Sequence, residues 1–208
     1  MTVLEARGVS GGYRTGADIL HEIDLTIRDG EIVVIVGPNG AGKSTFMKTV
    51  FGLTRVSAGT VYFQGHDITG LPPERIARPG ICYVPQERNV FPSLTVQENL
   101  EMGAYIRTDD FRPQIERIYA LFPRLAERRR QPVGHMSGGE PKFIDETFAQ
   151  VKRINDTGVG ILMVEQNAKQ ALAIADRGYV FASGRNRYDD DARTMLGNRE
   201  IAEMFLGG

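Results

Sequence analysis

A chain of 208 residues is long enough for one domain with a sizeable hydrophobic core, or for one domain that carries an inserted subdomain. Its 25 basic residues nearly balance 26 acidic ones, and this formal net charge of −1 argues against a general nucleic-acid-binding surface. A single cysteine, Cys82, excludes an internal disulfide, and no run of about 18 apolar residues is present that could span a membrane.

Two strand-like segments open the chain. Residues 2–9 and 19–28 alternate partly between apolar and polar side chains, and the turn signal Asp29-Gly30 leads into a further apolar run. Between the two segments, residues 10–14 predict a glycine-rich loop that exposes Tyr13. A tyrosine in such a loop could stack on a purine ring, and a plain surface tyrosine fits the same residues.

The next stretch, residues 31–53, reads EIVVIVGPNGAGKSTFMKTVFGL. It combines a β-branched apolar run, a glycine-rich loop and an apolar pattern with helical spacing. The loop fits the phosphate-binding pattern Gly-x4-Gly-Lys-Ser, which begins at Gly37 and ends at Gly42, Lys43 and Ser44. Glycines let backbone N–H groups close around a phosphate, and the N terminus of the following helix adds a favourable dipole. The stretch therefore predicts a nucleoside triphosphate as ligand, with Lys43 near its terminal phosphates and Ser44 as a ligand of Mg²⁺.

The middle of the chain changes from predicted strands to predicted helices. Residues 59–64 predict a strand that runs into a turn at 65–67, and residues 72–78 predict a short helix with proline in its first turn. The apolar residues 81–84 predict a second short buried strand, which would bury Cys82. Residues 95–107 and 111–130 predict helices, the first with the capping-box pair Thr95 and Glu98. The arginines at 128–130 fit a solvated helix end.

A second candidate phosphate-binding stretch is MSGGE at residues 136–140. A serine hydroxyl and glycine N–H groups at the start of a predicted helix make a compact anion site, but Ser-Gly-Gly alone is common and occurs again at residues 10–12. The stretch MSGGE becomes informative because a predicted phosphate-binding loop lies upstream in the same chain. With both stretches in one chain, the sequence resembles the ATP-binding subunit of an ABC transporter, and most closely the LivF-like branch that serves branched-chain amino acids.

This resemblance covers nearly the whole length and implies an architecture. The fold class would be α/β: a P-loop NTPase of the ABC nucleotide-binding type, with an antiparallel β subdomain and an inserted helical subdomain. The chain would form one nucleotide-binding domain over residues 1–208. Its core and β subdomain would take residues 1–86 and 141–208, and its helical subdomain about residues 87–140.

The resemblance also assigns roles to residues. Tyr13 would stack on adenine, Gln86 would link Mg²⁺ and the lytic water to the membrane partner, and Gln166 would stand at the switch position where most ABC ATPases carry histidine. Catalysis would involve Lys43, Gln86 and Gln166, and the metal would be held by Ser44 and Gln86. The ATP-binding residues of the phosphate loop would be Gly37, Asn39, Gly40, Gly42, Lys43, Ser44 and Thr45. The signature motif would be Ser137, Gly138, Gly139 and Glu140, which in such proteins contacts the γ-phosphate held by the opposite subunit.

Partners and location follow from the same resemblance. The chain would form a head-to-tail homodimer, or a heterodimer with a second ATP-binding subunit, and the dimer would enclose two ATP molecules with Mg²⁺. It would bind integral-membrane permease subunits at the cytoplasmic face of the membrane. A periplasmic or extracellular substrate-binding protein would take part indirectly, and no nucleic-acid partner is expected.

The sequence departs from the family pattern after Glu140. In ABC ATPases the signature glutamate opens a helix, which leads to a buried strand that ends in Asp-Glu, the Walker B motif. Here Pro141 follows directly, and the next residues resemble a later part of the family pattern. A helix, a strand and their connections, about 25–30 residues in all, are missing. The metal-holding aspartate and the glutamate that polarises water would be missing with them.

Two acidic positions compete for the Walker B role. Asp145-Glu146 offers the right pair of acids, but the apolar residues around it space like one face of a helix. Glu165 ends the apolar run 161–164, which the residues alone favour, whereas the residues after Glu165 match the switch region of ABC ATPases. The sequence therefore predicts an ATP-binding and ATP-hydrolysing subunit, with a nucleotide-binding subunit that cannot hydrolyse, or a truncated copy, as the alternative. A soluble P-loop kinase or GTPase would leave residues 137–140 unexplained.

Overall fold

The computed structural model describes residues 1–86, 89–136 and 143–198. The chain folds as two compact units: a first unit of Met1–Ile81 with Thr147–Gly208, and a second unit of Cys82–Glu146. The predicted limits of a helical subdomain, near residues 87 and 140, both lie outside the described residues, as does the junction between Glu140 and Pro141. That division stays a prediction.

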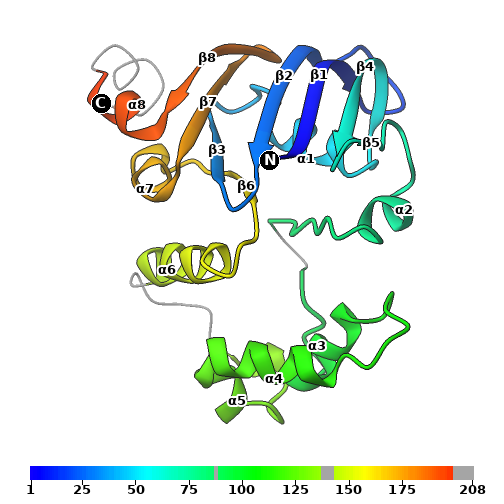
Figure 1. The fold of residues 1–208 in the computed structure, drawn as a ribbon, viewed down its shortest axis with the longest axis vertical. Helices are drawn as coiled ribbons and strands as arrows, with labels where there is room; N and C mark the ends of the chain where they lie inside the picture. Colours follow the sequence, from blue (N-terminus) through cyan, green and yellow to red (C-terminus); the bar gives the residue numbers. More distant parts are fainter. Residues whose placement is uncertain (87–88, 137–142, 199–208) are drawn as a thin grey trace. The chain divides into compact units, whose positions relative to one another are not determined.

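The first unit contains two four-stranded sheets (Figure 1). One sheet is antiparallel, with strand order β2-β1-β4-β5; the other has the order β6-β3-β7-β8, in which β3 runs parallel to β6 and β7 and only β8 is antiparallel. The strands are β1 (Thr2–Gly12), β2 (Leu20–Arg28), β3 (Ile32–Val36), β4 (Arg55–Phe63), β5 (His66–Asp67), β6 (Ile161–Val164), β7 (Arg177–Ala182) and β8 (Arg185–Asp191). The helices that accompany them are α1 (Lys43–Val50), α2 (Pro73–Ala77), α7 (Ala168–Ile174) and α8 (Ala192–Gly197). The helix α6 (Phe143–Asn155) begins in the second unit and ends in the first.

The strand β3 lies at the centre of the first unit, because all five of its side chains are fully buried. Successive side chains of a strand point to opposite faces of the sheet. Val33 and Ile35 accordingly pack with the antiparallel sheet and α1, whereas Val34 and Val36 pack with residues of α6, α7 and α8. This burial on both faces confirms the prediction from the unbroken β-branched run.

The second unit is helical and has a small core of its own. Its helices are α3 (Val96–Gly103), α4 (Arg112–Leu121), α5 (Pro123–Glu127) and the 3₁₀ helix η1 (Val133–His135). Val96, Ile115 and Tyr119 are buried together. The predicted capping box is confirmed: the Glu98 backbone N–H donates to Thr95 Oγ1 at 3.2 Å, and the Thr95 backbone N–H donates to Glu98 Oε2 at 2.8 Å.

Both predicted helices of the second unit are shorter than expected. The segment expected at 95–107 is helical only as far as Gly103. The segment expected at 111–130 is two helices, because Pro123 has no N–H for the helical hydrogen-bond ladder and starts α5 instead of continuing α4.

One strand prediction and part of one loop prediction were wrong. Residues 81–84 form no strand, their side chains are half-buried or exposed, and Cys82 is exposed instead of buried. A four-residue apolar run becomes a strand only where a neighbouring strand supplies hydrogen bonds, and none of the described strands pairs with this run. Residues 10–12 belong to β1 instead of a loop, since Gly11 pairs with Leu20 and Val56.

The strand β6 confirms the apolar run at 161–164, but all four of its side chains are only half-buried. Among the described strands β6 pairs with β3 alone, so it forms one edge of its sheet. The described residues contain no helix that is both long enough and apolar enough to cross a bilayer.

Candidate functional site

The loop between β3 and α1 needs glycine at two positions. Gly37 has φ of 142°, and a Cβ atom there would lie 2.1 Å from the backbone oxygen of Phe181, where no side chain fits. Gly42 has φ of 95° and immediately precedes the first residue of α1. Because L-residues with a side chain avoid this region of φ, glycine is needed there also. The loop therefore folds back sharply between a buried strand and a helix.

Lys43 is a buried cation inside this loop, with only 7% of its surface exposed. Its Nζ donates to the backbone oxygens of Gly37 at 2.6 Å and Pro38 at 2.9 Å. No carboxylate of the described residues forms an ion pair with it. Burial lowers the pKa of Lys43, because removal from water disfavours the charged form. An anion held in the loop would compensate this charge.

The N terminus of α1 is open to a ligand. No side chain of the described residues caps it, and its own first turn contains no acidic residue. The first intrahelical bond in this region runs from the Phe46 N–H to the Gly42 oxygen, so the N–H groups that precede Phe46 in the helix have no helical acceptor. Ser44 is exposed at this end, Thr45 is buried, and Asn39 and Gly40 are exposed in the loop. Unpaired N–H groups at a helix N terminus form an anion-binding site.

Tyr13 follows the last residue of β1, and 44% of its surface is exposed. It contacts α1 through Lys48, whose Nζ donates to the tyrosine hydroxyl at 3.3 Å. The structure thus brings Tyr13 to the helix that follows the phosphate loop. The sequence did not identify Lys48 as a site residue, because it lies 35 positions from Tyr13 and no sequence pattern predicts a contact between them.

Gln166 lies at the same edge of the sheet as the phosphate loop. The strands β3 and β6 are parallel, with Ile35 opposite Val164. The segments that follow the two strands therefore leave the sheet at the same edge, next to each other. Gln166 is exposed, and Glu165 is half-buried. Asn167 then caps α7 by accepting a hydrogen bond from the Gln170 N–H at 3.3 Å.

The other predicted site residues lie in the second unit or outside the described residues. Gln86 is exposed and belongs to the second unit. Ser137, Gly138, Gly139 and Glu140 lie outside the described residues. Of the two competing acidic positions, Asp145-Glu146 lies within the helix α6 and not at the end of a strand. Their roles stay predictions.

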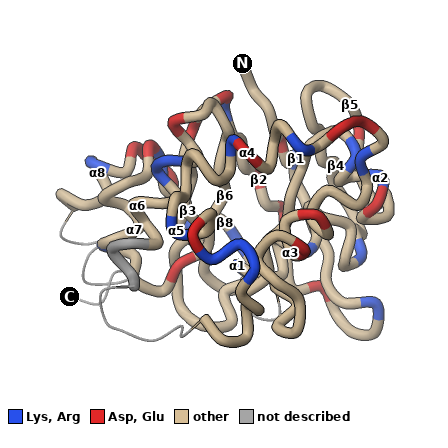
Figure 2. Tube along the Cα trace, turned by 90° about the horizontal axis from the view of Figure 1, so that it is seen from below, with Lys and Arg blue, Asp and Glu red and all other residues tan. Residues whose placement is uncertain are grey.

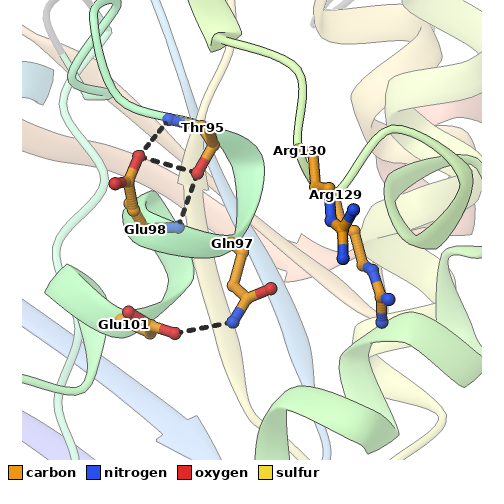
Figure 3. A pocket seen from close by; sticks show the side chains of 6 residues that line it. All are labelled: Thr95, Gln97, Glu98, Glu101, Arg129 and Arg130. Carbon is orange, nitrogen blue, oxygen red and sulfur yellow. Dashed lines mark hydrogen bonds between the residues drawn. The ribbon is translucent and has the colours of Figure 1, made fainter.

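A cavity of about 330 Å³ in the second unit has a different character. Figure 3 shows Glu98 and Glu101 of α3 on one side and the two arginines on the other. The hydrogen bond from the Thr95 backbone N–H, with that from its hydroxyl, lowers the pKa of Glu98, so this carboxylate is already engaged in the cap. The cavity is lined by Thr95, Gln97, Glu98, Glu101, Arg129 and Arg130. Mixed charges and an engaged carboxylate make it a poorer anion site than the β3–α1 loop.

The overall charge distribution of the chain adds little to the electrostatic field at the β3–α1 loop. Basic and acidic residues are interspersed along the described trace (Figure 2). The field at the β3–α1 loop therefore comes mainly from nearby groups, which are the Lys43 ammonium and the N terminus of α1.

A family comparison decides what kind of protein contains this loop. Residues 20–150 match the family model described as ABC transporter. The chain belongs to the ABC transporter family. The phosphate loop, Lys43 and the start of α1 all lie inside the matched residues.

Similar proteins cover most of this ABC transporter chain. The high-affinity branched-chain amino acid transport ATP-binding protein BraG of Pseudomonas aeruginosa is 37% identical over 91% of this chain and 93% of its own length. The probable branched-chain amino acid transport ATP-binding protein LivF of Archaeoglobus fulgidus is 33% identical over 96% of each chain. The lipopolysaccharide export system ATP-binding protein LptB of Escherichia coli K12 is 32% identical over all of this chain and 98% of its own.

Solved structures confirm the predicted fold class. An ATP-binding cassette of an ABC transporter in its ADP conformation matches all of this chain and all of its own, with a TM-score of 0.84 and 20% identity. A nucleotide-free cassette matches 98% of each chain with a TM-score of 0.79 and 19% identity. The protein is an α/β P-loop NTPase of the ABC cassette type.

The alignment lengths also bear on the departure after Glu140. The alignment with LptB has 237 positions and takes in the whole chain, which has 208 residues, so at least 29 positions have no residue here. This number falls within the predicted range for the missing helix, strand and connections. The position of the gap after Glu140 rests on the motif pattern.

Proposed function

We propose that this ABC protein is the ATP-binding and ATP-hydrolysing subunit of an importer for branched-chain or related amino acids. The observation that carries the nucleotide site is the β3–α1 loop, where a buried lysine without a described carboxylate partner lies beside an uncapped helix N terminus. A triphosphate would accept hydrogen bonds from both and would remove the uncompensated charge.

Each residue of the site would have a separate task. Lys43 would release its contacts with the loop carbonyls and stabilise the charge that develops on the transferred phosphoryl group. Tyr13 would stack on the adenine ring. Ser44 and Gln86 would hold Mg²⁺, which suits their oxygen donors and which, when bound, neutralises phosphate charge. Gln166, at the carboxyl edge next to the loop, would approach the γ-phosphate.

Completion of the site would need a second subunit. Ser137, Gly138, Gly139 and Glu140 would reach the ATP held by the opposite subunit of a homodimer or heterodimer. The dimer would lie against permease subunits at the cytoplasmic face of the membrane, and a substrate-binding protein outside the membrane would deliver the cargo. Amino acids are proposed as cargo because BraG and LivF have the higher identities among the three relatives above, while LptB is named for lipopolysaccharide export.

A second candidate function is nucleotide binding without hydrolysis. The 29 alignment positions without a residue here favour it, since Walker B belongs to the segment proposed to be missing. The half-buried edge strand β6 points the same way, because an all-apolar strand is typical of the interior of a parallel sheet. In this case ATP would bind and hold a dimer together without turnover.

Steady-state ATP turnover by the purified 208-residue chain distinguishes the two candidates. The first predicts phosphate release that Lys43→Ala abolishes and that Lys152→Ala, which changes an exposed lysine of α6, leaves intact. Saturable ATP binding without phosphate release would instead support the second. If turnover occurs, Glu165→Gln tests whether the acid at the end of β6 polarises the water.

A further inference from the structure

The side chain of Lys48 contacts the hydroxyl edge of an aromatic residue, Tyr13. Its Nζ lies 5.5 Å from the centroid of the Tyr13 ring and donates to the Tyr13 hydroxyl at 3.3 Å. Because the Nζ is much closer to the hydroxyl than to the ring centre, the hydrogen bond is the contact that joins the two side chains. Lys48 is half-buried on α1, five residues after Lys43, so the two lysines leave the helix in different directions.

Within the part of the chain that the structure describes, neither residue has another polar partner to compete. Lys48 forms no ion pair with a described carboxylate, and no other described side chain is hydrogen-bonded to the Tyr13 hydroxyl. Tyr13 follows β1 and is substantially exposed, so packing alone holds its ring weakly. The contact with Lys48 is therefore what fixes the ring against α1.

We propose that Lys48 is a positioning residue for the nucleotide base: it holds the Tyr13 ring in the orientation in which adenine stacks on it. A ring that is already held loses less conformational freedom when a base stacks on it, and binding is correspondingly tighter. The ammonium lies at the hydroxyl edge of the ring, so it does not cover the face on which the base stacks. Lys48 thereby increases affinity for triphosphates that carry a base over triphosphates that carry none.

This inference rests on the proposed function, because it needs ATP in the β3–α1 loop and adenine at Tyr13. The inference gives Lys48 and Lys43 different roles, because each lysine acts on a different part of the ligand. Lys43 acts on the phosphates, whereas Lys48 acts on the base through Tyr13 and makes no contact with phosphate.

Isothermal titration of the full chain with ATP, and separately with inorganic tripolyphosphate, both with Mg²⁺, tests the assignment. Lys48→Met is expected to weaken ATP binding about 2- to 5-fold, the effect of losing one exposed hydrogen bond, and to leave tripolyphosphate binding unchanged. Lys48→Arg keeps a donor that reaches the Tyr13 hydroxyl and is expected to restore ATP affinity. Tyr13→Ala is expected to weaken ATP binding by about 5-fold or more. Added to Tyr13→Ala, Lys48→Met then has no further effect.

Two results in which Lys48→Met does lose ATP affinity would still overturn the role of Lys48. One is an equal loss of ATP and tripolyphosphate affinity in Lys48→Met, which would assign the lysine to phosphate or to folding. The other is a loss of ATP affinity from Lys48→Met that is as large in the Tyr13→Ala variant as in the wild-type chain, which would show that Lys48 acts without the ring. If Tyr13→Ala itself leaves ATP affinity unchanged, the proposed adenine site fails and this inference fails with it. Loss in Tyr13→Ala but none in Lys48→Met removes the inference alone.

Discussion

Single residues of this protein are constrained most tightly where the chain would hold phosphate. Gly37 approaches the backbone of Phe181 so closely that even one methyl group would clash, and Lys43 is buried against carbonyl oxygens with no described carboxylate to neutralise it. Such a lysine is unfavourable for stability by itself, because burial penalises its charge. Unfavourable arrangements of this kind are typical of functional sites.

Replacement of Gly37 tests this constraint. Gly37→Ala is expected to abolish ATP binding and to lower the free energy of unfolding by about 1–3 kcal/mol, because the new Cβ displaces the loop or β7. Gly103→Ala is the matched control, since no heavy atom lies within 4 Å of its added Cβ. Chemical denaturation and ATP titration measure both effects. Normal ATP affinity in Gly37→Ala would contradict the proposed role of the loop geometry.

A second group of residues, remote from phosphate chemistry, ties the two sheets together. Glu31 and Arg177 form an ion pair in which both side chains are largely buried, and Arg177 Nη2 also donates to the Thr26 backbone oxygen at 2.6 Å. Burial raises the pKa of Glu31, but hydrogen bonds from Arg177 and from the Arg28 N–H outweigh it, so the pKa lies below its ordinary value of 4.5. The ionised form of Glu31 therefore stabilises the fold.

The pH dependence of stability follows from the sign of that shift. A carboxyl group with a lowered pKa contributes stability above its unfolded-state value and loses it as the pH falls through the folded-state value. Glu31→Gln is expected to cost about 1–3 kcal/mol at pH 7, with a deficit relative to wild type that shrinks below about pH 4.5. Glu74→Gln, in α2, serves as an exposed control. A deficit of constant size from pH 7 to pH 3 would contradict the role of the charge.

At the scale of elements, the sequence pattern correctly predicted helices, strands and caps that depend on residues close together in the chain. The strand β3, the helix that starts at Lys43 and the capping box at Thr95 depend on residues close together in the sequence, and all three were predicted correctly. Residues 81–84 have the composition of a strand but no described strand to pair with, and a ladder partner is a non-local property. The contact of Lys48 with Tyr13 was unpredictable for the same reason, since 35 residues separate them.

The exposure of residues 81–84 gives a direct chemical prediction. Cys82 is the only cysteine of the chain, so a thiol reagent reports on this segment alone. The native protein is expected to release one equivalent of thionitrobenzoate from Ellman's reagent without denaturant, at a rate close to that of the unfolded chain. Cys82→Ser should release none. A native protein that reacts only after denaturation would show that the segment is a buried strand, as the sequence alone predicts.

For the whole molecule, the sequence predicted the fold class and family because two candidate phosphate-binding stretches occur in one chain. It did not predict how the chain accommodates the missing positions, since that depends on which strands remain next to β6. The structure has β6 at a sheet edge with half-buried apolar side chains. The proposed nucleotide binding would depend on β3, its loop and α1, all of which the structure describes. The proposed hydrolysis would depend on the Walker B acids, which the family pattern places after Glu140.

The most direct test of the central claim, that the β3–α1 loop binds ATP, is equilibrium titration of the 208-residue chain with ATP and Mg²⁺. The wild-type chain is expected to bind one ATP per chain, and Lys43→Ala is expected to lose that binding while keeping the wild-type circular dichroism spectrum. The account would be contradicted if the folded wild-type chain bound no ATP, or if Lys43→Ala bound ATP as tightly as wild type.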